Sequence, residues 1–121
     1  MKPFPTYLKE KERYVVFTVE SAGKPDRKTV INSICSAVLD YAGEATAARA
    51  GFRVVEYDEN LQKGILRAGT ENLEEVIAGL AMLERIGQEP ASIITQHVSG
   101  TLKKARAEDI KTLGLFTRTN D

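Results

Sequence analysis

The stretch FRVVEYDENLQKGILRAG, residues 52–69, consists of two short apolar runs separated by a polar segment. The runs, residues 52–58 and 63–69, are rich in the β-branched and aliphatic residues that suit strands. Asp58 and Asn60 flank and occupy the connecting segment, where short polar side chains favour turns. The stretch therefore predicts a β-hairpin, and the fold follows from what lies on either side of it.

A strand and a helix are expected before the hairpin. Residues 13–20, RYVVFTVE, alternate in a way that would place Val15, Phe17 and Val19 on one face of a sheet and Tyr14, Val16 and Thr18 on the other. Pro25 or Asp26 can open a helix that continues to about Ala42, with Gly43 as its stop. Its apolar residues recur at spacings of three and four and predict one buried stripe: Val30, Ile31, Ile34, Cys35, Val38, Leu39 and Tyr41.

The order of elements after the hairpin completes the pattern. Residues 44–51, EATAARAG, fit either a helical turn or a packed connection. Thr70 can cap a second helix that carries Glu71, Glu74 and Glu75 in its first turn, and Gly87 would end it. Pro90 precedes a β-branched run ending at Ser99, and Ser99, Gly100 and Thr101 break that strand and offer a hydroxyl cap to a last helix.

The resulting order, β-α-β-β-α-β with a C-terminal helix, predicts an α+β, ferredoxin-like sandwich of the kind seen in RNA-recognition motifs. Two helices would cover one face of a four-stranded antiparallel sheet. At 121 residues the chain fits one domain, residues 1–121, with residues 1–12 as an extended N-terminal segment.

The charge balance limits the kinds of partner. Seventeen Lys and Arg residues match seventeen Asp and Glu residues, so any attraction to nucleic acid must come from a local patch. A single cysteine excludes an intrachain disulfide framework and a Cys-rich zinc site, which favours the cytoplasm. Charged residues interrupt every apolar run well short of the roughly 20 residues of a bilayer span, and the proline-containing start does not resemble a signal peptide.

Candidate catalytic residues are few. Cys35 lies on the apolar stripe of the first helix, so we interpret it as a small core residue. His97 is expected to share a strand face with Ile93 and Thr95, and without a ligand cluster it is interpreted as structural or exposed, not as a catalytic or metal-binding residue. No metal site is expected, because turn propensity explains Asp58 and Glu59. Paired base stacking on the sheet is disfavoured, because the third strand has no aromatic residue.

Two groups of cations remain as candidates for binding a polyanion. Lys103, Lys104 and Arg106 crowd the start of the last helix, and Lys9, Lys11 and Arg13 lead into the first strand. If the first and last strands are antiparallel neighbours, Arg13 lies near Ser99 and Gly100, and both groups share one edge of the sheet. Charge alone leaves a solvated face an equal alternative, because Glu10, Glu12, Glu108 and Asp109 dilute the cations.

The order of motifs resembles ribonuclease P protein component 2, the archaeal counterpart of a subunit of eukaryotic ribonuclease P and MRP. The likeness spans YLKEKERYVVFTV (residues 7–19), the segment 57–106 and the basic last helix. Its most specific parts are the polar turn followed by GILR (64–67) and the segment VSGTLKKAR (98–106).

The resemblance implies an accessory subunit that supports the ribonuclease P RNA in removing the 5′ leader from precursor tRNA. It implies that the catalytic centre and Mg²⁺ belong to the RNA, that this chain has no catalytic residues and binds no cofactor, and that a barrel-shaped component 3 and a homodimer within a heterotetramer are partners. Carried over residue by residue, the basic contacts are Arg13, Lys103, Lys104 and Arg106, with Ser99 and Gly100 shaping their approach. A ligand-binding regulatory domain and a pure protein adaptor are the alternatives.

Overall fold

The computed structural model describes residues 11–107. In chain order the elements are β1 (Glu12–Ser21), α1 (Arg27–Ala42), α2 (Glu44–Ala50), β2 (Arg53–Asp58), β3 (Lys63–Gly69), the 3-10 turn η2 (Thr70–Asn72), α3 (Leu73–Ala81), β4 (Arg85–Ile86) and β5 (Glu89–Ser99). One more helix follows at residues 102–107 and is called the last helix here.

The strands form one antiparallel sheet in the order β2-β3-β1-β5-β4. The four long strands have the order of a ferredoxin-like fold, so the predicted α+β class is confirmed. The hairpin of residues 52–69 is also confirmed, with Asp58 paired to Lys63. Its turn is held by the Asp58 carboxylate, which accepts hydrogen bonds from the amides of Asn60 and Leu61 at 2.9 and 3.1 Å.

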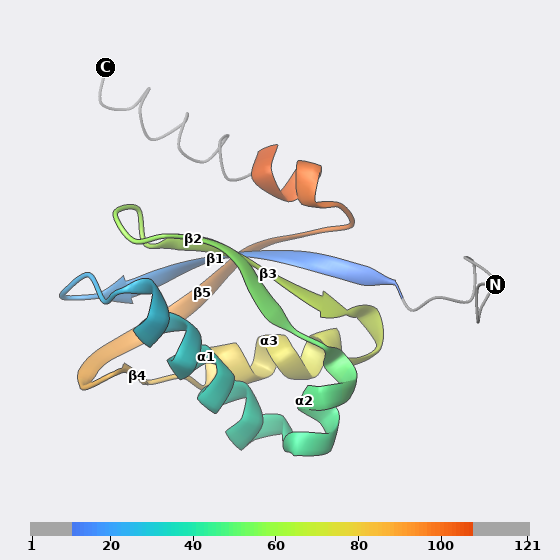
Figure 1. Cartoon of the computed structure of the whole chain (residues 1–121), viewed down its shortest axis with the longest axis horizontal. Coiled ribbons are helices and arrows are strands. Elements are labelled where there is room, and N and C mark those ends of the chain that lie inside the picture. Colours follow the sequence, from blue (N-terminus) through green and yellow to red (C-terminus); the bar gives the residue numbers. More distant parts are fainter. Residues whose placement is uncertain (1–10, 108–121) are drawn as a thin grey trace.

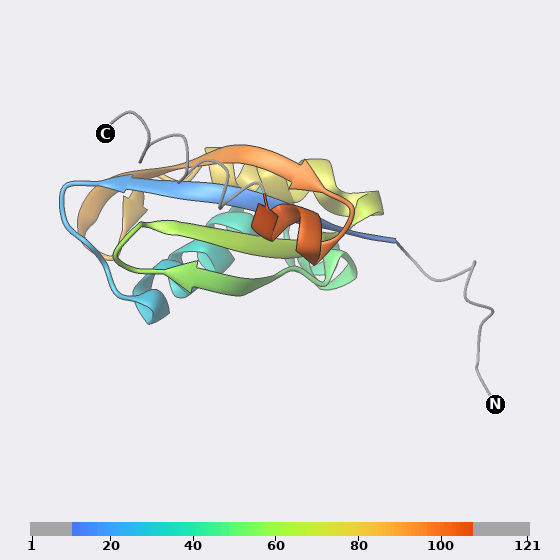
Figure 2. The same ribbon diagram turned by 90° about the horizontal axis from the view of Figure 1, so that it is seen from above.

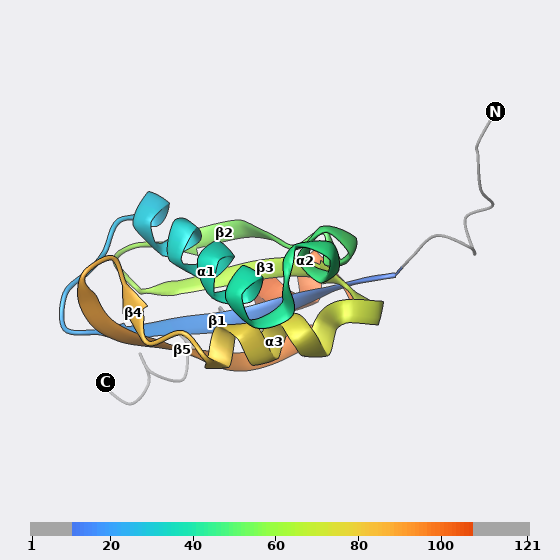
Figure 3. The same ribbon diagram turned by 90° about the horizontal axis from the view of Figure 1, so that it is seen from below.

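Helices lie on both faces of this sheet. α1, α2 and α3 cover one face, here called the helical face, while the last helix crosses the opposite, outer face (Figures 1 and 2). Figure 3 shows α1 and α3 side by side over β1 and β3. The predicted alternation of β1 is confirmed, because Val15, Phe17 and Val19 join the main core whereas Val16 joins a small second core beneath the last helix.

The helices differ in part from the sequence predictions. The segment 44–51, predicted as either a helical turn or a packed connection, contains the helix α2, Glu44–Ala50. The stripe of α1 is narrower than predicted, since Leu39 and Tyr41 are 41% and 51% exposed. Thr70 does not cap α3, which begins at Leu73 after the 3-10 turn and has no side-chain cap.

The prediction that Gly87 ends the second helix is also wrong. α3 ends at Ala81, and residues 85–86 form the extra strand β4, which places Ile86 in the core at 1% exposure. Gly87 has a φ of 62° and therefore serves the tight turn from β4 into β5, a backbone conformation that favours glycine. The sheet has five strands instead of the four expected.

Candidate nucleic-acid interface

The start of β1 lies beside the end of β5. Tyr14 pairs with Ser99 in antiparallel register, so the backbone of Arg13 reaches the Ser99-Gly100 segment as predicted. This register depends on a β-bulge, because the pairing shifts between Val16, opposite His97, and Phe17, opposite Thr95, which leaves Gln96 as the extra residue.

The bulge changes the face on which the end of β5 projects. Thr95 pairs with Phe17 on the helical face, whereas His97 pairs with Val16 on the outer face. The prediction that His97 shares a face with Ile93 and Thr95 is therefore wrong, because the inserted Gln96 breaks the alternation. His97 is exposed, as is Gln96, whose amide nitrogen donates to the Thr18 hydroxyl at 3.2 Å.

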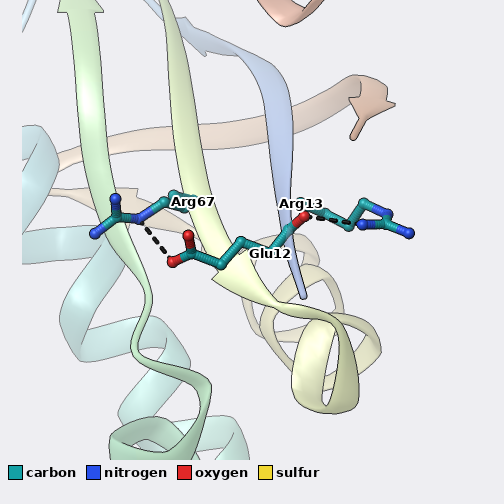
Figure 4. A network of polar contacts seen from close by, with 3 residues as sticks. All are labelled: Glu12, Arg13 and Arg67. Atoms are coloured by element: carbon teal, nitrogen blue, oxygen red, sulfur yellow. Dashed lines mark hydrogen bonds and ion pairs between the residues drawn. The ribbon is translucent and has the colours of Figure 1, made fainter. Parts of the chain in front are cut away.

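The two cation groups do not share a face of the sheet. Arg13 pairs with Ala68, a member of the main core, and so projects on the helical side. Its Nη1 donates to the Glu12 carbonyl at 2.9 Å, and Figure 4 shows its side chain on the opposite side of Glu12 from Arg67. Lys11 is exposed, and its carbonyl accepts the Thr70 amide at 2.9 Å. Lys9 lies outside the described residues.

The last helix presents its cations on the outer face. The Thr101 hydroxyl accepts the Lys104 amide at 3.2 Å, which is the hydroxyl cap predicted for this helix. Leu102 and the fully buried Ala105 pack on the second core, while Lys103 and Lys104 are exposed. Neither lysine side chain forms an ion pair within residues 11–107. Both lysine side chains are thus accessible to a ligand.

Arg106 is engaged differently. Its guanidinium forms an ion pair with Glu56 of β2, with a hydrogen bond of 2.5 Å from Nε to the carboxylate. The side chains keep 56% and 38% of their surface exposed, so the pair lies at the solvent boundary of the outer face. The pair links the last helix to an edge strand.

Ser99 and Gly100 differ in burial and in their packing. Ser99 is only 5% exposed, and its hydroxyl oxygen has no hydrogen-bond partner among the described residues. Gly100 is exposed, and a Cβ added there would meet nothing within 4 Å. Ser99 is therefore part of the packed junction beneath the last helix, whereas nothing in the described surroundings requires glycine at position 100.

Two arginines of the outer face were not singled out from the sequence. Arg53 of β2 pairs directly with Arg67 of β3, and Arg67 pairs in turn with Tyr14 of β1. The Nε of Arg67 lies 3.1 Å from the Glu12 carboxylate (Figure 4). Their neighbours Val54 and Leu66 are core residues of the helical face, so both arginines project from the outer face. No direct signal in the sequence indicated this pairing, because Arg53 lies five residues before Asp58 and Arg67 four residues after Lys63, and a register shift between Val54 and Glu56 brings them opposite each other.

Cys35 and His97 lie on different sides of the sheet, Cys35 on α1 of the helical face and His97 on the outer face. Cys35 is half-buried, and burial raises the pKa of its thiol, which disfavours the reactive thiolate. Within residues 11–107 no group of three or more His, Cys, Asp and Glu side chains is arranged to hold a metal ion. In the same part of the chain no helix is long and apolar enough to cross a bilayer.

A groove of about 840 Å³ lies on the other side of the molecule, between α1 and residues 82–87. Asn32, Ser36 and Asp40 line its α1 wall, and Tyr41 and Met82, which are 51% and 63% exposed, add apolar surface. The guanidinium of Arg85 in the facing wall is held by the Gln88 carbonyl at 3.0 Å. This mixture of apolar, neutral polar and acidic groups is unlike a surface for a polyanion.

Comparison with known proteins gives a consistent set of relatives. The model of the Rpp14/Pop5 family matches residues 13–110. A protein named "Ribonuclease P protein component 2" from Methanocaldococcus jannaschii is 36% identical over 115 residues, covering 95% of this chain and 82% of that protein. A protein of the same name from Pyrococcus furiosus is 30% identical over 113 residues, covering 93% and 94% of the two chains.

A solved structure shares the fold. A chain in the cryo-EM structure of yeast ribonuclease MRP superimposes with a TM-score of 0.63, covering 92% of this chain and 95% of that chain at 10% sequence identity. At this identity the likeness concerns the fold alone. It supports the ferredoxin-like arrangement derived from the strand order.

Proposed function

The chain belongs to the Rpp14/Pop5 family, and from this membership we propose that it is a protein subunit of ribonuclease P, the ribonucleoprotein endoribonuclease that removes the 5′ leader from precursor tRNA. The observation that carries the proposal is the family match over residues 13–110, which covers the sheet from the second residue of β1 onward and the last helix at residues 102–107. The expectation drawn from GILR and VSGTLKKAR thus agrees with the family and the names of the relatives.

We propose that the subunit acts by supporting RNA and contributes no catalytic residue. Cleavage and the Mg²⁺ it needs would belong to the RNA, and this chain would bind no cofactor of its own. The separation of its reactive side chains supports this assignment: Cys35 belongs to α1 on the helical face, while His97 belongs to the outer face. The single cysteine fits a cytoplasmic location, where thiols stay reduced.

The proposed RNA contacts centre on the last helix. Lys103 and Lys104 would neutralise phosphates directly, and Arg106 would do so at the cost of its ion pair with Glu56. Lys11, Arg13 and Lys9 would extend the contact around the edge at the start of β1, with Ser99 and Gly100 forming the junction. Each lysine that meets a phosphate releases counterions, so binding should weaken steeply with salt.

The groove beside α1, defined by Asp40, Tyr41, Met82 and Arg85, is the proposed contact for a protein partner. The partner we assign to it is the barrel-shaped component 3, while a homodimer of this chain within a heterotetramer would use other surface. Exposed apolar side chains on the groove favour a protein over RNA, and its acidic groups disfavour phosphate. Precursor tRNA would meet this chain through the assembled enzyme.

The alternatives make different predictions. A ligand-binding regulatory domain would be stabilised by a small molecule, and a pure protein adaptor would be insensitive to loss of Lys103 and Lys104. Neither alternative explains why the chain is similar to ribonuclease P proteins and also exposes Lys103 and Lys104 on the last helix.

The test is cleavage of precursor tRNA by the cognate ribonuclease P RNA with component 3 at limiting Mg²⁺, with and without this chain. A large gain in rate that needs this chain, and that falls when Lys103→Gln and Lys104→Gln are combined, is the expected result. An unchanged rate with all components folded would refute the subunit role. A gain that survives the double substitution would point to an adaptor.

A further inference from the structure

The outer face carries an arginine pair, Arg53 and Arg67, which is not among the proposed RNA contacts. The two residues are direct antiparallel partners on β2 and β3, strands that lie about 4.8 Å apart in a sheet. Like charges directly opposite each other destabilise a sheet, so a pair of arginines at this position needs a compensating negative charge.

The carboxylates nearby compensate this charge only in part. Glu12 of β1 reaches Arg67, with 3.1 Å between its carboxylate oxygen and Nε, and within residues 11–107 it forms neither an ion pair nor a hydrogen bond with the Arg53 side chain. The pairing of β2 with β3 also shifts its register, between Val54 and Glu56. Glu56, which follows this shift, is ion-paired with Arg106 of the last helix. Within residues 11–107, the guanidinium of Arg53 therefore has neither an ion pair nor a hydrogen bond, and the residue is exposed.

The guanidinium of Arg67 is already oriented by the Glu12 carboxylate. Its Nε faces Glu12, and Figure 4 shows the other two nitrogens of its guanidinium directed over β2, the strand that carries Arg53. A guanidinium presents planar donors that match two oxygens of one phosphate, and a side chain already fixed by a carboxylate loses less freedom on binding.

The surroundings favour a polyanion over an acidic protein. Lys103 and Lys104 belong to the last helix, whose Leu102 and Ala105 pack on the second core of the same outer face. Tyr14, the β1 partner of Arg67, packs against this core. The exposed large apolar residues of the described chain come from α1, the hairpin turn, the end of α3 and β5, and none comes from β2 or β3. Protein interfaces bury an apolar centre, whereas phosphate recognition needs only the cations.

We propose that Arg53 and Arg67 clamp the phosphate backbone of RNA, as a second contact beside Lys103 and Lys104. The proposal rests on the subunit role proposed above and adds a residue pair and a location to it. The RNA strand would then run across the outer face from the last helix to β2, and the arginines would add affinity without reading sequence.

The test uses the complex of this chain with component 3 and the ribonuclease P RNA. Arg53→Gln should lower RNA affinity by roughly 3- to 10-fold at ~0.15 M salt and reduce the salt slope by about one. Arg53→Lys should recover part of that loss, since it restores charge without the planar fork. Arg49→Gln is the matched control, because Arg49 is an exposed arginine of α2 on the helical face.

The outcomes separate this inference from the proposed function. If the complex binds RNA and Arg53→Gln behaves like Arg49→Gln, the clamp is refuted while the subunit role stands. Loss of component 3 binding at unchanged RNA affinity would also refute it and make the pair a protein contact. RNA binding that depends on Arg53 without any gain in cleavage would keep the clamp and refute the function; a complex without RNA affinity refutes both.

Discussion

Arg106 of the last helix is ion-paired to Glu56 of β2, fifty residues earlier in the chain, across the outer face of the sheet. Beneath the pair, Ala105 and Leu102 pack on Val16 and Ile65. Burial of these apolar groups holds the helix in place, whereas an exposed ion pair contributes only about 0–1 kcal/mol. The pair therefore adds little to the stability of the helix, and its main effect is on how much positive charge Arg106 leaves available to a ligand.

Glu56→Gln and Arg106→Gln distinguish a tether from an RNA contact. Both substitutions break the same ion pair, so both should change the free energy of unfolding by no more than about 1 kcal/mol in urea titrations. Their effects on RNA affinity should have opposite signs, because the first frees a cation and the second removes it. Filter binding at several salt concentrations measures this. Equal losses from both variants would make Arg106 only a tether.

Gly64 should be intolerant of a side chain. A Cβ at this position of β3 would lie 2.6 Å from Cζ of Phe17, 2.8 Å from the Glu56 carbonyl oxygen and 2.9 Å from Cδ1 of Tyr57. These rings stack with centroids 6.1 Å apart, so alanine would force the rings and the strand to move. Gly64→Ala should cost about 1–3 kcal/mol of unfolding free energy, as overpacking does.

Gly100→Ala is the control for that substitution. An added Cβ there meets nothing within 4 Å, so its effect on stability should stay within about 0.5 kcal/mol. Urea titrations of both variants with unchanged slopes make the comparison valid. Equal stability of the two variants would show that the Phe17-Tyr57 packing yields without cost.

The long strands of the sheet could be predicted because the signals for a strand and for a turn come from residues that are neighbours in the chain. Alternation in residues 13–20 assigned the faces of β1 correctly, and the polar residues after Asp58 located the turn of the hairpin. The end of β5 could not be predicted in the same way. A single extra residue, Gln96, moves His97 to the outer face, and nothing in the order of residues distinguishes a bulge from regular alternation.

The candidate site was predicted only in part. Neighbouring strands brought Arg13 to the Ser99-Gly100 segment as expected, yet its side chain projects on the helical side, since backbone proximity does not fix the face. The ion pair of Arg106 joins residues fifty positions apart, and the Arg53-Arg67 pair depends on the exact register of the hairpin. Such relationships arise from tertiary pairing, which the spacing of charges along the chain does not reveal.

Asp26 should make the stability of α1 depend on pH. Hydrogen bonds from the Thr29 hydroxyl and amide hold the pKa of this N-cap carboxyl below its usual value. Because the folded pKa is lowered, the stabilisation is present above the unfolded pKa and is lost as pH falls through the folded pKa. Asp26→Asn keeps a capping oxygen without the titration. Thermal melts across acidic pH should show a smaller loss for Asp26→Asn; parallel losses would contradict the assignment.

The groove beside α1 provides the test of the protein partner. Tyr41 and Met82 are more than half exposed on its rim, so replacing them should scarcely affect folding but should remove apolar area from any interface that covers them. Tyr41→Ser combined with Met82→Ser should weaken binding to component 3 by at least ~10-fold, which corresponds to about 1.4 kcal/mol. The RNA affinity of the complexes that still form should stay unchanged, because the cations of the outer face lie on the opposite side of the sheet.

Leu61→Ser, at the exposed hairpin turn, removes similar apolar surface elsewhere and serves as the control. Calorimetry with purified component 3 measures the loss, and sedimentation of the chain alone reports self-association. If the double variant binds component 3 normally but no longer self-associates, the groove is the surface of a homodimer and its assignment to component 3 is wrong.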